Sequence, residues 1–161
     1  MPGDALPILA CACASLRRAS RAVSRVYDGW LDGNAQQFSL LYVLDKQRGR
    51  PVTQKWIGEL LSLDPTTLTR TLAPLAKRKF IRARPGGDRR ERQWSLTDAG
   101  RKQLERLYPR WEQAQKILKN RFGVERWEPL LEELAVIATA ARFRLQDGVK
   151  TVRAKPRRIE E

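Results

Sequence analysis

The spacing of apolar residues predicts a chain that is mostly helical. A recurrence every three or four positions is typical of amphipathic α-helices. This period is found along residues 6–30, 36–46, 56–61, 65–75, 104–118 and 125–146. Gly33, Gly49 and Gly123 interrupt it, and glycine is a frequent residue at helix ends. The sequence therefore predicts a set of helices joined by short connections.

Residues 80–96 have the pattern of a small β-hairpin instead. Residues 80–84 and 93–96 read as short strands, and residues 85–88 favour a turn because they contain proline and two glycines. The two helices before the hairpin are joined by a tight turn, as in a helix-turn-helix pair. The predicted fold class is mainly α with a small β-wing: a winged helix-turn-helix with N- and C-terminal dimerisation helices.

The helix over residues 65–75 has the features of a DNA recognition helix. Asp64 can cap its N-terminus, and Pro65 suits the first helical position, where no N–H is needed. The polar face presents hydroxyl groups and one guanidinium, from Thr66, Thr67, Thr69 and Arg70. Such groups at a helix N-terminus reach phosphates and base edges in a major groove. Taken alone, the segment also fits an ordinary amphipathic helix with a polar outer face.

The hairpin that follows carries a basic tip, formed by Asp88, Arg89, Arg90 and Arg92. A basic hairpin by itself is usually only solvated. Placed directly after a helix-turn-helix pair, it completes a winged helix-turn-helix, in which the helix enters a major groove and the hairpin tip reaches the adjacent minor groove. The combination therefore predicts binding to double-stranded DNA.

The helices at both ends of the chain have narrow apolar stripes. From Leu9 to Trp30 the stripe steps by three and four residues, as in a coiled-coil seam, and arginines occupy a different face. Such stripes favour packing against a second subunit, so we expect a homodimer that addresses a pseudo-palindromic operator. The expected domains are an N-terminal dimerisation helix (1–34), a winged helix-turn-helix module (35–97), C-terminal dimerisation helices (98–147) and a disordered basic tail (148–161).

Composition supports a polyanionic partner and argues against catalysis. Lys and Arg number 32 against 18 acids, which gives a net charge of +14. The chain has no histidine, so Ser-His, Cys-His and His-metal chemistry are excluded, and we expect neither an enzyme nor a cofactor. No apolar run is long enough to span a membrane. Residues 1–15 lack the basic segment of a signal peptide, so we expect a cytoplasmic protein.

Three segments carry a family resemblance. They are residues 64–70, residues 75–81, and the wing sequence 88–90 together with the Leu-Thr-x-x-Gly pattern at 96–100. Over residues 10–145 the chain resembles the MarR family of bacterial transcription regulators. The resemblance implies the winged fold, an obligate dimer and ligand-responsive release of DNA, with Arg90 in the minor groove and Asp88 holding the shape of the wing. Lys79 departs from the family, which commonly has glycine there. Lys79 must adopt a left-handed conformation at a cost, or the helix must end differently.

Cys11 and Cys13 leave two interpretations open. On a helix, residues i and i+2 point about 200° apart, so the two thiols cannot pair without unwinding. Cys13 is then a small core residue and Cys11 is incidental. The alternative is a redox role, because the spacing from Cys13 to Tyr27 resembles that of the peroxide-sensing OhrR branch of the family. A second tyrosine of that branch would fall near Ala35 and is missing. Arg17 could lower a thiol pKa.

A small-molecule inducer is the other candidate signal. The residues expected to line its pocket, between the dimer layer and the winged module, are Arg17, Tyr27, Trp30, Phe38 and Tyr42. Aromatic residues at helical spacing are also the ordinary contents of a core. The predicted function is a homodimeric, sequence-specific DNA-binding regulator, expected to be a repressor, released by a small molecule or by thiol oxidation. The alternative is a sequence-indifferent architectural protein that coats nucleic acid through its charge.

Overall fold

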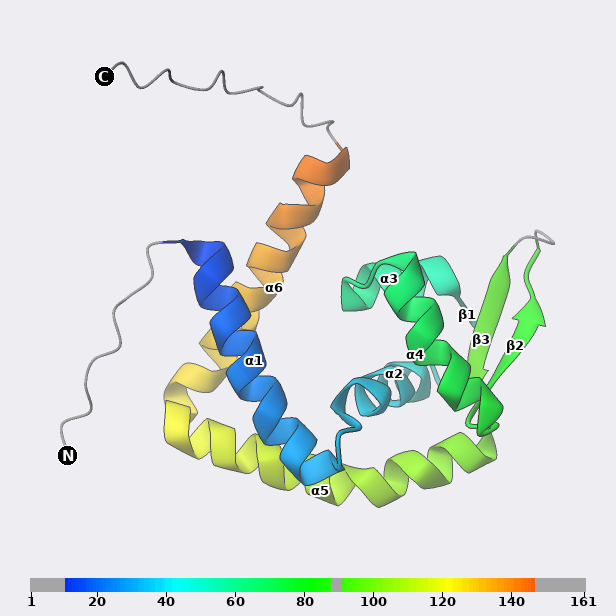
Figure 1. Ribbon diagram of the computed structural model, residues 1–161, viewed down its shortest axis with the longest axis horizontal. Coiled ribbons are helices and arrows are strands. Elements are labelled where there is room, and N and C mark those ends of the chain that lie inside the picture. The colour runs from blue at the N-terminus through cyan, green and yellow to red at the C-terminus, as the bar shows by residue number, and fades with distance from the viewer. Residues whose placement is uncertain (1–10, 88–90, 147–161) are drawn as a thin grey trace, which may run out of the picture. The chain divides into compact units, whose positions relative to one another are not determined.

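The computed structural model describes residues 11–87 and 91–146, which divide into two compact units, one ending at Arg121 and one beginning at Phe122. Figure 1 shows the order of elements in the first unit. They are α1 (Ala12–Leu31), α2 (Ala35–Lys46), β1 (Val52–Thr53), α3 (Gln54–Leu61), α4 (Pro65–Lys77), β2 (Ile81–Pro85), β3 (Arg92–Leu96) and most of α5 (Asp98–Phe122). The mainly α architecture with a small β-wing is confirmed.

The predicted caps position the helices of the helix-turn-helix pair. The Thr53 hydroxyl accepts from the N–H of Trp56 at 3.1 Å and begins α3. Asp64 caps α4, and Pro65 is its first residue. Each cap satisfies an N–H group that has no partner within its helix. One boundary was predicted wrongly: Cys11 has extended backbone angles and lies just before α1. The i, i+2 helical argument therefore does not apply to the two cysteines.

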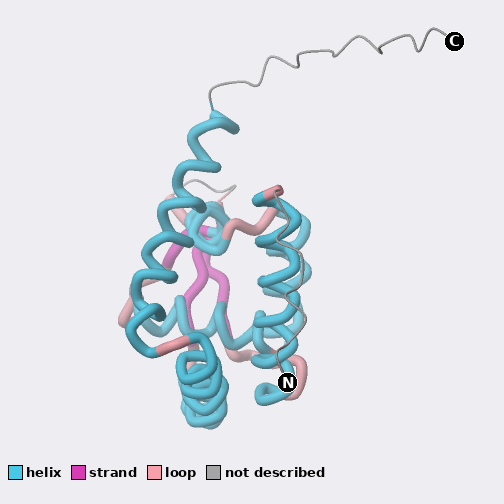
Figure 2. Tube along the Cα trace, turned by 90° about the vertical axis from the view of Figure 1, so that its left-hand side faces the viewer, coloured by secondary structure: helices cyan, strands magenta, loops and turns pink. Residues whose placement is uncertain are grey.

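The sheet contains a strand that the sequence pattern did not predict. Figure 2 shows the strands as a small part of a mainly helical chain. The sheet has three strands in the order β1-β3-β2, with antiparallel neighbours. In the predicted hairpin, Ile81 pairs with Leu96 and Pro85 with Arg92. Pro85 therefore ends β2 instead of beginning the turn. The missed strand, β1, adds only the pairs Val52–Trp94 and Thr53–Gln93.

The core of the first unit lies between the helix-turn-helix pair, the sheet and α5. The buried apolar side chains come from every one of these elements and from α2, including Leu41, Ile57, Leu72, Trp94 and Leu104. α2 and α5 are also joined by an ion pair between Arg101 and Asp45 at 2.6 Å. The core thus fixes the recognition helix and the hairpin on one scaffold.

The second unit consists of the end of α5 and of α6 (Val124–Gln146). Gly123, with φ of +111°, separates the two helices, as predicted. Trp127 is buried, and its ring lies edge-on to Phe122 at 6.5 Å. Every side chain from 131 to 141 is exposed. In the described part of the chain, no helix is both long enough and apolar enough to cross a lipid bilayer.

Candidate nucleic-acid interface

Asp64 fixes the N-terminus of α4. One of its carboxylate oxygens accepts from the backbone N–H groups of Thr66 and Thr67, each at 3.0 Å. The other oxygen accepts from the Thr67 hydroxyl at 2.5 Å. This hydroxyl bond is the main cause that lowers the pKa of Asp64, because hydrogen bonds to a carboxylate favour its ionised form. Asp64 therefore stays charged while it caps the helix, and it engages one of the predicted contact hydroxyls.

The predicted contact residues of α4 are not equivalent. The Thr69 hydroxyl donates to the carbonyl of Pro65 at 2.8 Å and accepts from Gln54 Nε2 at 3.1 Å. Carboxylate and carbonyl oxygens can only accept, so the hydroxyl protons of Thr67 and Thr69 are both used within the chain. The Thr67 hydroxyl can still accept, the Thr69 hydroxyl keeps the acceptor site that Gln54 does not use, and both methyl groups are available. Thr66 is exposed, and its hydroxyl makes no hydrogen bond to another described residue.

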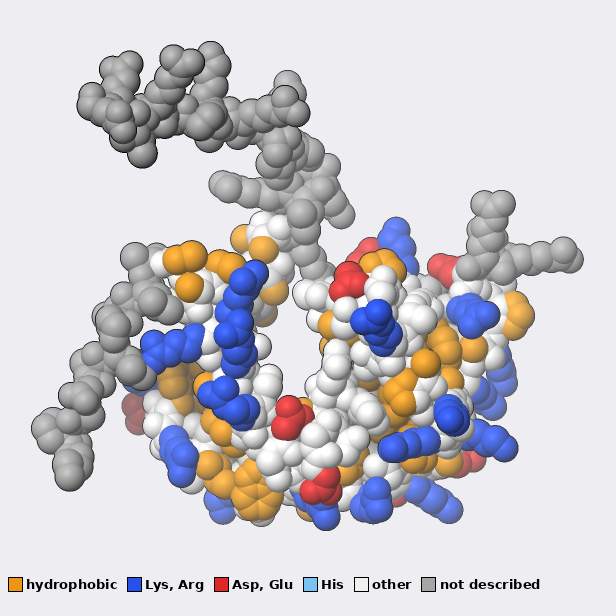
Figure 3. Space-filling view, viewed as in Figure 1, with side chains coloured by type: hydrophobic (Ala, Val, Ile, Leu, Met, Phe, Trp, Pro, Cys, Tyr) orange, Lys and Arg blue, Asp and Glu red, His pale blue; other side chains and the backbone are white. Residues whose placement is uncertain are grey.

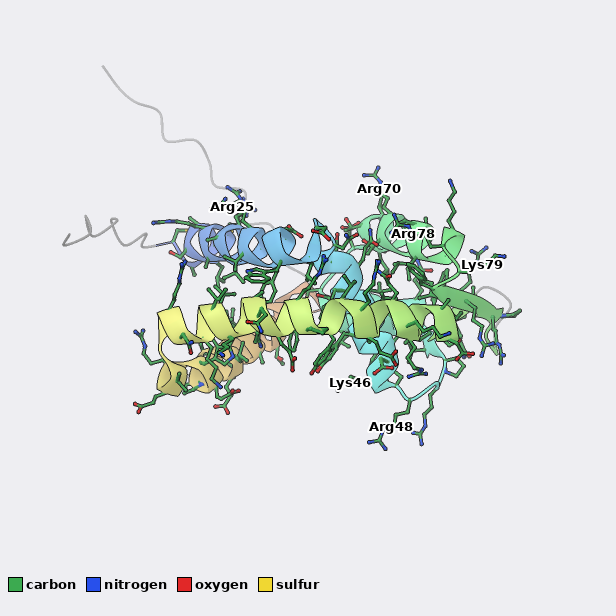
Figure 4. The ribbon with its side chains drawn as sticks, turned by 90° about the horizontal axis from the view of Figure 1, so that it is seen from below. Arg25, Lys46, Arg48, Arg70, Arg78 and Lys79 are labelled. Atoms are coloured by element: carbon green, nitrogen blue, oxygen red, sulfur yellow. The ribbon has the colours of Figure 1, made fainter. Side chains whose placement is uncertain are left out.

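Arg70 follows Thr69 directly in α4 and brings a positive charge to the same helix. Figure 4 shows that its side chain points away from the body of the first unit. Arg78 follows at the C-terminal end of the same helix. Lys46 and Arg48 point to the opposite side. None of the salt bridges between described residues involves these four cations. The outer face of α4 therefore presents hydroxyls beside uncompensated positive charge.

The hairpin adds cations next to α4. Arg84 and Arg92 are exposed on its two strands, and Arg82 Nε donates to the Ser95 hydroxyl at 3.2 Å across them. The hairpin closes through a bond from the Gly86 N–H to the Glu91 carbonyl at 2.7 Å. The predicted tip residues Asp88, Arg89 and Arg90 lie outside the described residues, whereas Arg92 begins β3.

The Leu-Thr-x-x-Gly sequence at 96–100 joins the recognition helix to the hairpin and to α5. The Thr97 hydroxyl lies within hydrogen-bonding distance of the Lys79 carbonyl (2.7 Å) and the Phe80 carbonyl (3.0 Å). It also accepts from the N–H of Gly100 at 3.1 Å, so it caps α5. A Cβ on Gly100 would lie 2.0 Å from the Phe80 carbonyl oxygen. This position needs glycine because α5 begins directly against the backbone that ends α4.

Lys79 adopts the left-handed conformation, with φ of +58°. The first of the two predicted outcomes is therefore observed, and the residue bears a conformational cost that glycine would avoid. The N–H of Phe80 bonds to the Leu75 carbonyl at 2.9 Å, which closes the last turn of α4. The left-handed residue thus turns the chain from α4 into β2.

Gln54 is a site residue that sequence reasoning missed. It is the first residue of α3, and its side chain reaches Thr69 on α4. No local pattern indicates this contact, because the two residues are 15 positions apart. It follows from the packing of the two helices and occupies one acceptor site of the Thr69 hydroxyl, whose proton goes to the Pro65 carbonyl.

The structure separates the predicted pocket residues. A cavity of about 660 Å³ in the first unit lies between α1, α2 and α5 and is lined by Tyr27, Phe38, Asp28 and Trp111, among others. The Tyr27 hydroxyl donates to Gln115 Oε1 of α5, and burial raises the pKa of Tyr27. Of the other predicted residues, Tyr42 stacks on Trp111 at 5.8 Å outside this lining, and Trp30 and Arg17 are exposed.

Both cysteines are exposed thiols in the single chain. Cys13 therefore does not pack in the core of its own subunit. Tyr27 lies 14 residues further along α1, which corresponds to about 21 Å along the helix axis. The resemblance to a cysteine–tyrosine pair consequently has no contact within one chain to support it.

A family model and several solved structures match this chain. Residues 32–91 match the MarR family. MosR from M. tuberculosis, a transcriptional regulator solved in complex with DNA, is 29% identical, with a TM-score of 0.71 over 82% of this chain and 96% of that chain. CouR, a transcriptional repressor bound to a DNA duplex, is 27% identical, with a TM-score of 0.69 over 80% and 92%. PcaV from Streptomyces coelicolor, in complex with its natural ligand, is 20% identical and shares the fold, with a TM-score of 0.72 over 86% and 99%.

The comparison with curated proteins gives no match. The family match covers the helix-turn-helix pair and the first strand of the hairpin, and the likeness to solved structures extends over most of the chain. The observed caps, wing and Leu-Thr-x-x-Gly junction lie in or beside the matched segment. Residues 32–91 therefore match the winged helix-turn-helix segment of the MarR family, and the likeness to DNA-bound transcriptional regulators extends over most of the chain.

Proposed function

We propose that the protein is a homodimeric, sequence-specific DNA-binding repressor whose release is triggered by a small molecule. The observation that carries this proposal is the outer face of α4, where exposed Thr66 and Arg70 stand beside uncompensated cations on a rigid helix. The DNA complexes of MosR and CouR support it, because both relatives share the fold. In this proposal α4 enters a major groove and the hairpin arginines meet the adjacent minor groove.

The hydrogen bonds of α4 assign different roles to its residues. Thr66 and Arg70 have free donors, which suit phosphate oxygens and the acceptor edge of guanine. Thr67 and Thr69 have used their protons, so they are suited to accept from a base amino group or to contact a thymine methyl group with their own methyl groups. Arg70 is therefore the residue expected to read a base.

The homodimer is proposed from the exposed apolar side chains of the terminal helices. On α6, Leu131, Leu134 and Ile137 are 41%, 38% and 44% exposed, and on α1 Trp30 is 40% exposed. Helices with apolar faces in water gain most of their stability by packing that face against another helix. A second copy supplies it, and two recognition helices then address half-sites about 34–36 Å apart.

The cavity beside Tyr27 is the proposed inducer site. Its volume lies within the range of about 300–1,000 Å³ common for small-molecule sites. Among its lining residues Asp28 alone is charged, and Tyr27, Phe38 and Trp111 provide aromatic surface. A carboxylate beside aromatic rings favours a neutral or positively charged aromatic ligand over an aromatic acid. A ligand there contacts α1, α2 and α5 together and can shift the spacing of the two recognition helices.

Thiol oxidation is the competing trigger, because Cys13 is exposed. The two triggers can be separated on the DNA complex of the purified protein. Release by phenethylamine but not by benzoate, lost in Asp28→Asn, is expected for the inducer site. Release by an organic hydroperoxide, lost in Cys13→Ser, would assign the trigger to the thiol instead.

The experiment that tests DNA reading is an operator selection from random duplexes followed by affinity measurements. Arg70→Ala should lose about 1–3 kcal/mol on the selected operator and relax the preference at one position per half-site. Arg48→Ala removes the same charge on the opposite side and should keep the preference. An equal loss on every sequence would make Arg70 a phosphate contact, and no loss would remove α4 from the interface.

A further inference from the structure

A ridge of arginines runs along α1 on the same side as the recognition helix. Arg17, Arg21 and Arg25 follow one another at four-residue intervals, with Arg18 beside them, and all four are exposed. Residues four apart lie above one another on a helix, so the ridge extends about 12 Å along the axis from Arg17 to Arg25. These residues also border a shallow hollow on the surface of α1. We call this surface the α1 ridge.

The α1 ridge carries charge that the protein itself does not compensate. No salt bridge between described residues involves these arginines. Like charges at i, i+4 destabilise a helix by about 0.2–0.5 kcal/mol per pair, and the ridge contains two such pairs, Arg17–Arg21 and Arg21–Arg25. The arrangement costs stability in the free protein, and a polyanion would relieve that cost.

The side to which the α1 ridge points indicates that its polyanionic partner is DNA. Figure 4 shows Arg25 on α1 and Arg70 on α4 pointing to the same side of the first unit. In Figure 3, Lys and Arg side chains gather over α1 on the face that also presents α4. A duplex held against the outer face of α4 therefore continues on the side to which the α1 ridge points.

We propose that the α1 ridge binds the phosphate backbone of the operator DNA beyond the base pairs that α4 and the hairpin contact. This proposal rests on the proposed DNA-binding function. The ridge presents guanidinium groups outside the proposed groove contacts, where the backbone phosphates are their partners, and phosphate contacts carry no sequence information. It therefore adds affinity, salt dependence and footprint length, and leaves base preference to α4. α1 is thus a DNA-contacting element as well as a candidate for dimerisation.

The test compares two charge-matched double variants of the full-length protein. Arg21→Gln/Arg25→Gln removes two positive charges per subunit from the ridge. Lys46→Gln/Arg48→Gln removes two from the opposite side of the first unit. Affinity for a duplex of about 40 base pairs, four helical turns, with the selected operator at its centre, is measured between 50 and 200 mM salt. Arg21→Lys/Arg25→Lys retains the charge and controls for changes in helix packing.

Each phosphate contact contributes about 0.9 to the slope of log affinity against log salt. The ridge variant should lower that slope by about 2–4 per dimer, so its deficit relative to wild type should grow about tenfold or more from 200 to 50 mM salt. Its base preference should be unchanged, its hydroxyl-radical footprint should shorten, and the lysine variant should recover both slope and footprint.

Several results would overturn the proposal. If the ridge variant and the opposite-side control have the same slope and the same footprint, α1 does not contact DNA. If the ridge variant differs from the control only in binding to phosphatidylserine vesicles, the ridge faces a membrane. A failure of the proposed function is distinguishable from both, because the wild-type protein would then select no operator and Arg70→Ala would have no effect.

Discussion

The close approach of Gly100 to Phe80 gives a prediction with a definite sign. An added Cβ would lie 2.0 Å from the Phe80 carbonyl oxygen, 2.9 Å from its carbon and 2.8 Å from Leu96 Cδ1. Two of these atoms are backbone, so no side-chain rotation can relieve the contact. To restore a normal separation, the start of α5 and the end of α4 must move apart by roughly 1 Å, into positions that a packed core resists.

The magnitude of the Gly100→Ala effect follows from three contributions. Overpacking costs about 1–3 kcal/mol. The displacement also weakens the bonds from the Thr97 N–H and hydroxyl to the Phe80 carbonyl, at about 0.5–1.5 kcal/mol each. Alanine recovers about 1 kcal/mol of helix propensity. The net loss in free energy of unfolding is about 1–5 kcal/mol, and at about 2–4 °C per kcal/mol the Tm falls by about 2–20 °C.

Gly29→Ala is the matched control for this substitution. Gly29 lies within α1, is exposed, and has no heavy atom within 4 Å of an added Cβ. The same chemical change should therefore stabilise the protein by about 0.4–1 kcal/mol. Thermal unfolding followed by circular dichroism, at equal protein concentration, measures both. Equal Tm shifts for the two variants would refute the close approach of α5 to Phe80.

Three further predictions concern the same scaffold. Lys79→Gly should raise the free energy of unfolding by about 0.5–1 kcal/mol, because it removes a left-handed non-glycine residue, whereas Lys79→Ala should give no gain in a denaturant titration. Thr97→Ala should lower the free energy of unfolding by about 1–2 kcal/mol, because the cap of α5 is lost, and Thr97→Ser should recover most of this loss. Equal unfolding free energies for the serine and alanine variants would contradict the role of the hydroxyl. Burial raises the pKa of Tyr27, so above about pH 10 this tyrosine ionises first in the unfolded chain, and the free energy of unfolding falls as pH rises. Tyr27→Phe should flatten that decline. Identical profiles of unfolding free energy against pH for the variant and the wild type would be evidence against the burial.

Local signals in the sequence predict the elements of the DNA-binding module. Asp64 and Thr97 cap their helices through N–H groups two or three residues further on, and Pro65 begins α4 directly after its cap, so these capping effects can be read from neighbouring positions. The left-handed conformation of Lys79 was one of two outcomes implied by the family resemblance, because the family commonly has glycine there. These residues fix α4, the hairpin and the start of α5.

Contacts between distant segments could not be predicted in this way. β1 is only two residues long, too short to show an alternating pattern, and it exists because Val52 pairs with Trp94. Trp111 lines the cavity from α5, and Gln54 engages Thr69 from α3. Each depends on how the helices pack, which helical periodicity does not specify. Cys13 is also exposed, although its place on the apolar stripe of α1 favoured a core position.

The central claim is that the protein recognises a DNA sequence and does not simply coat DNA through its charge. The most direct measurement is the ratio of its affinities for the selected operator and for a random duplex of equal length, in about 0.15 M salt. A ratio of about 10³ or more is predicted for a sequence-specific regulator. A ratio near one, with equally steep salt dependence for both duplexes, would contradict the account and indicate a charge-driven coating protein.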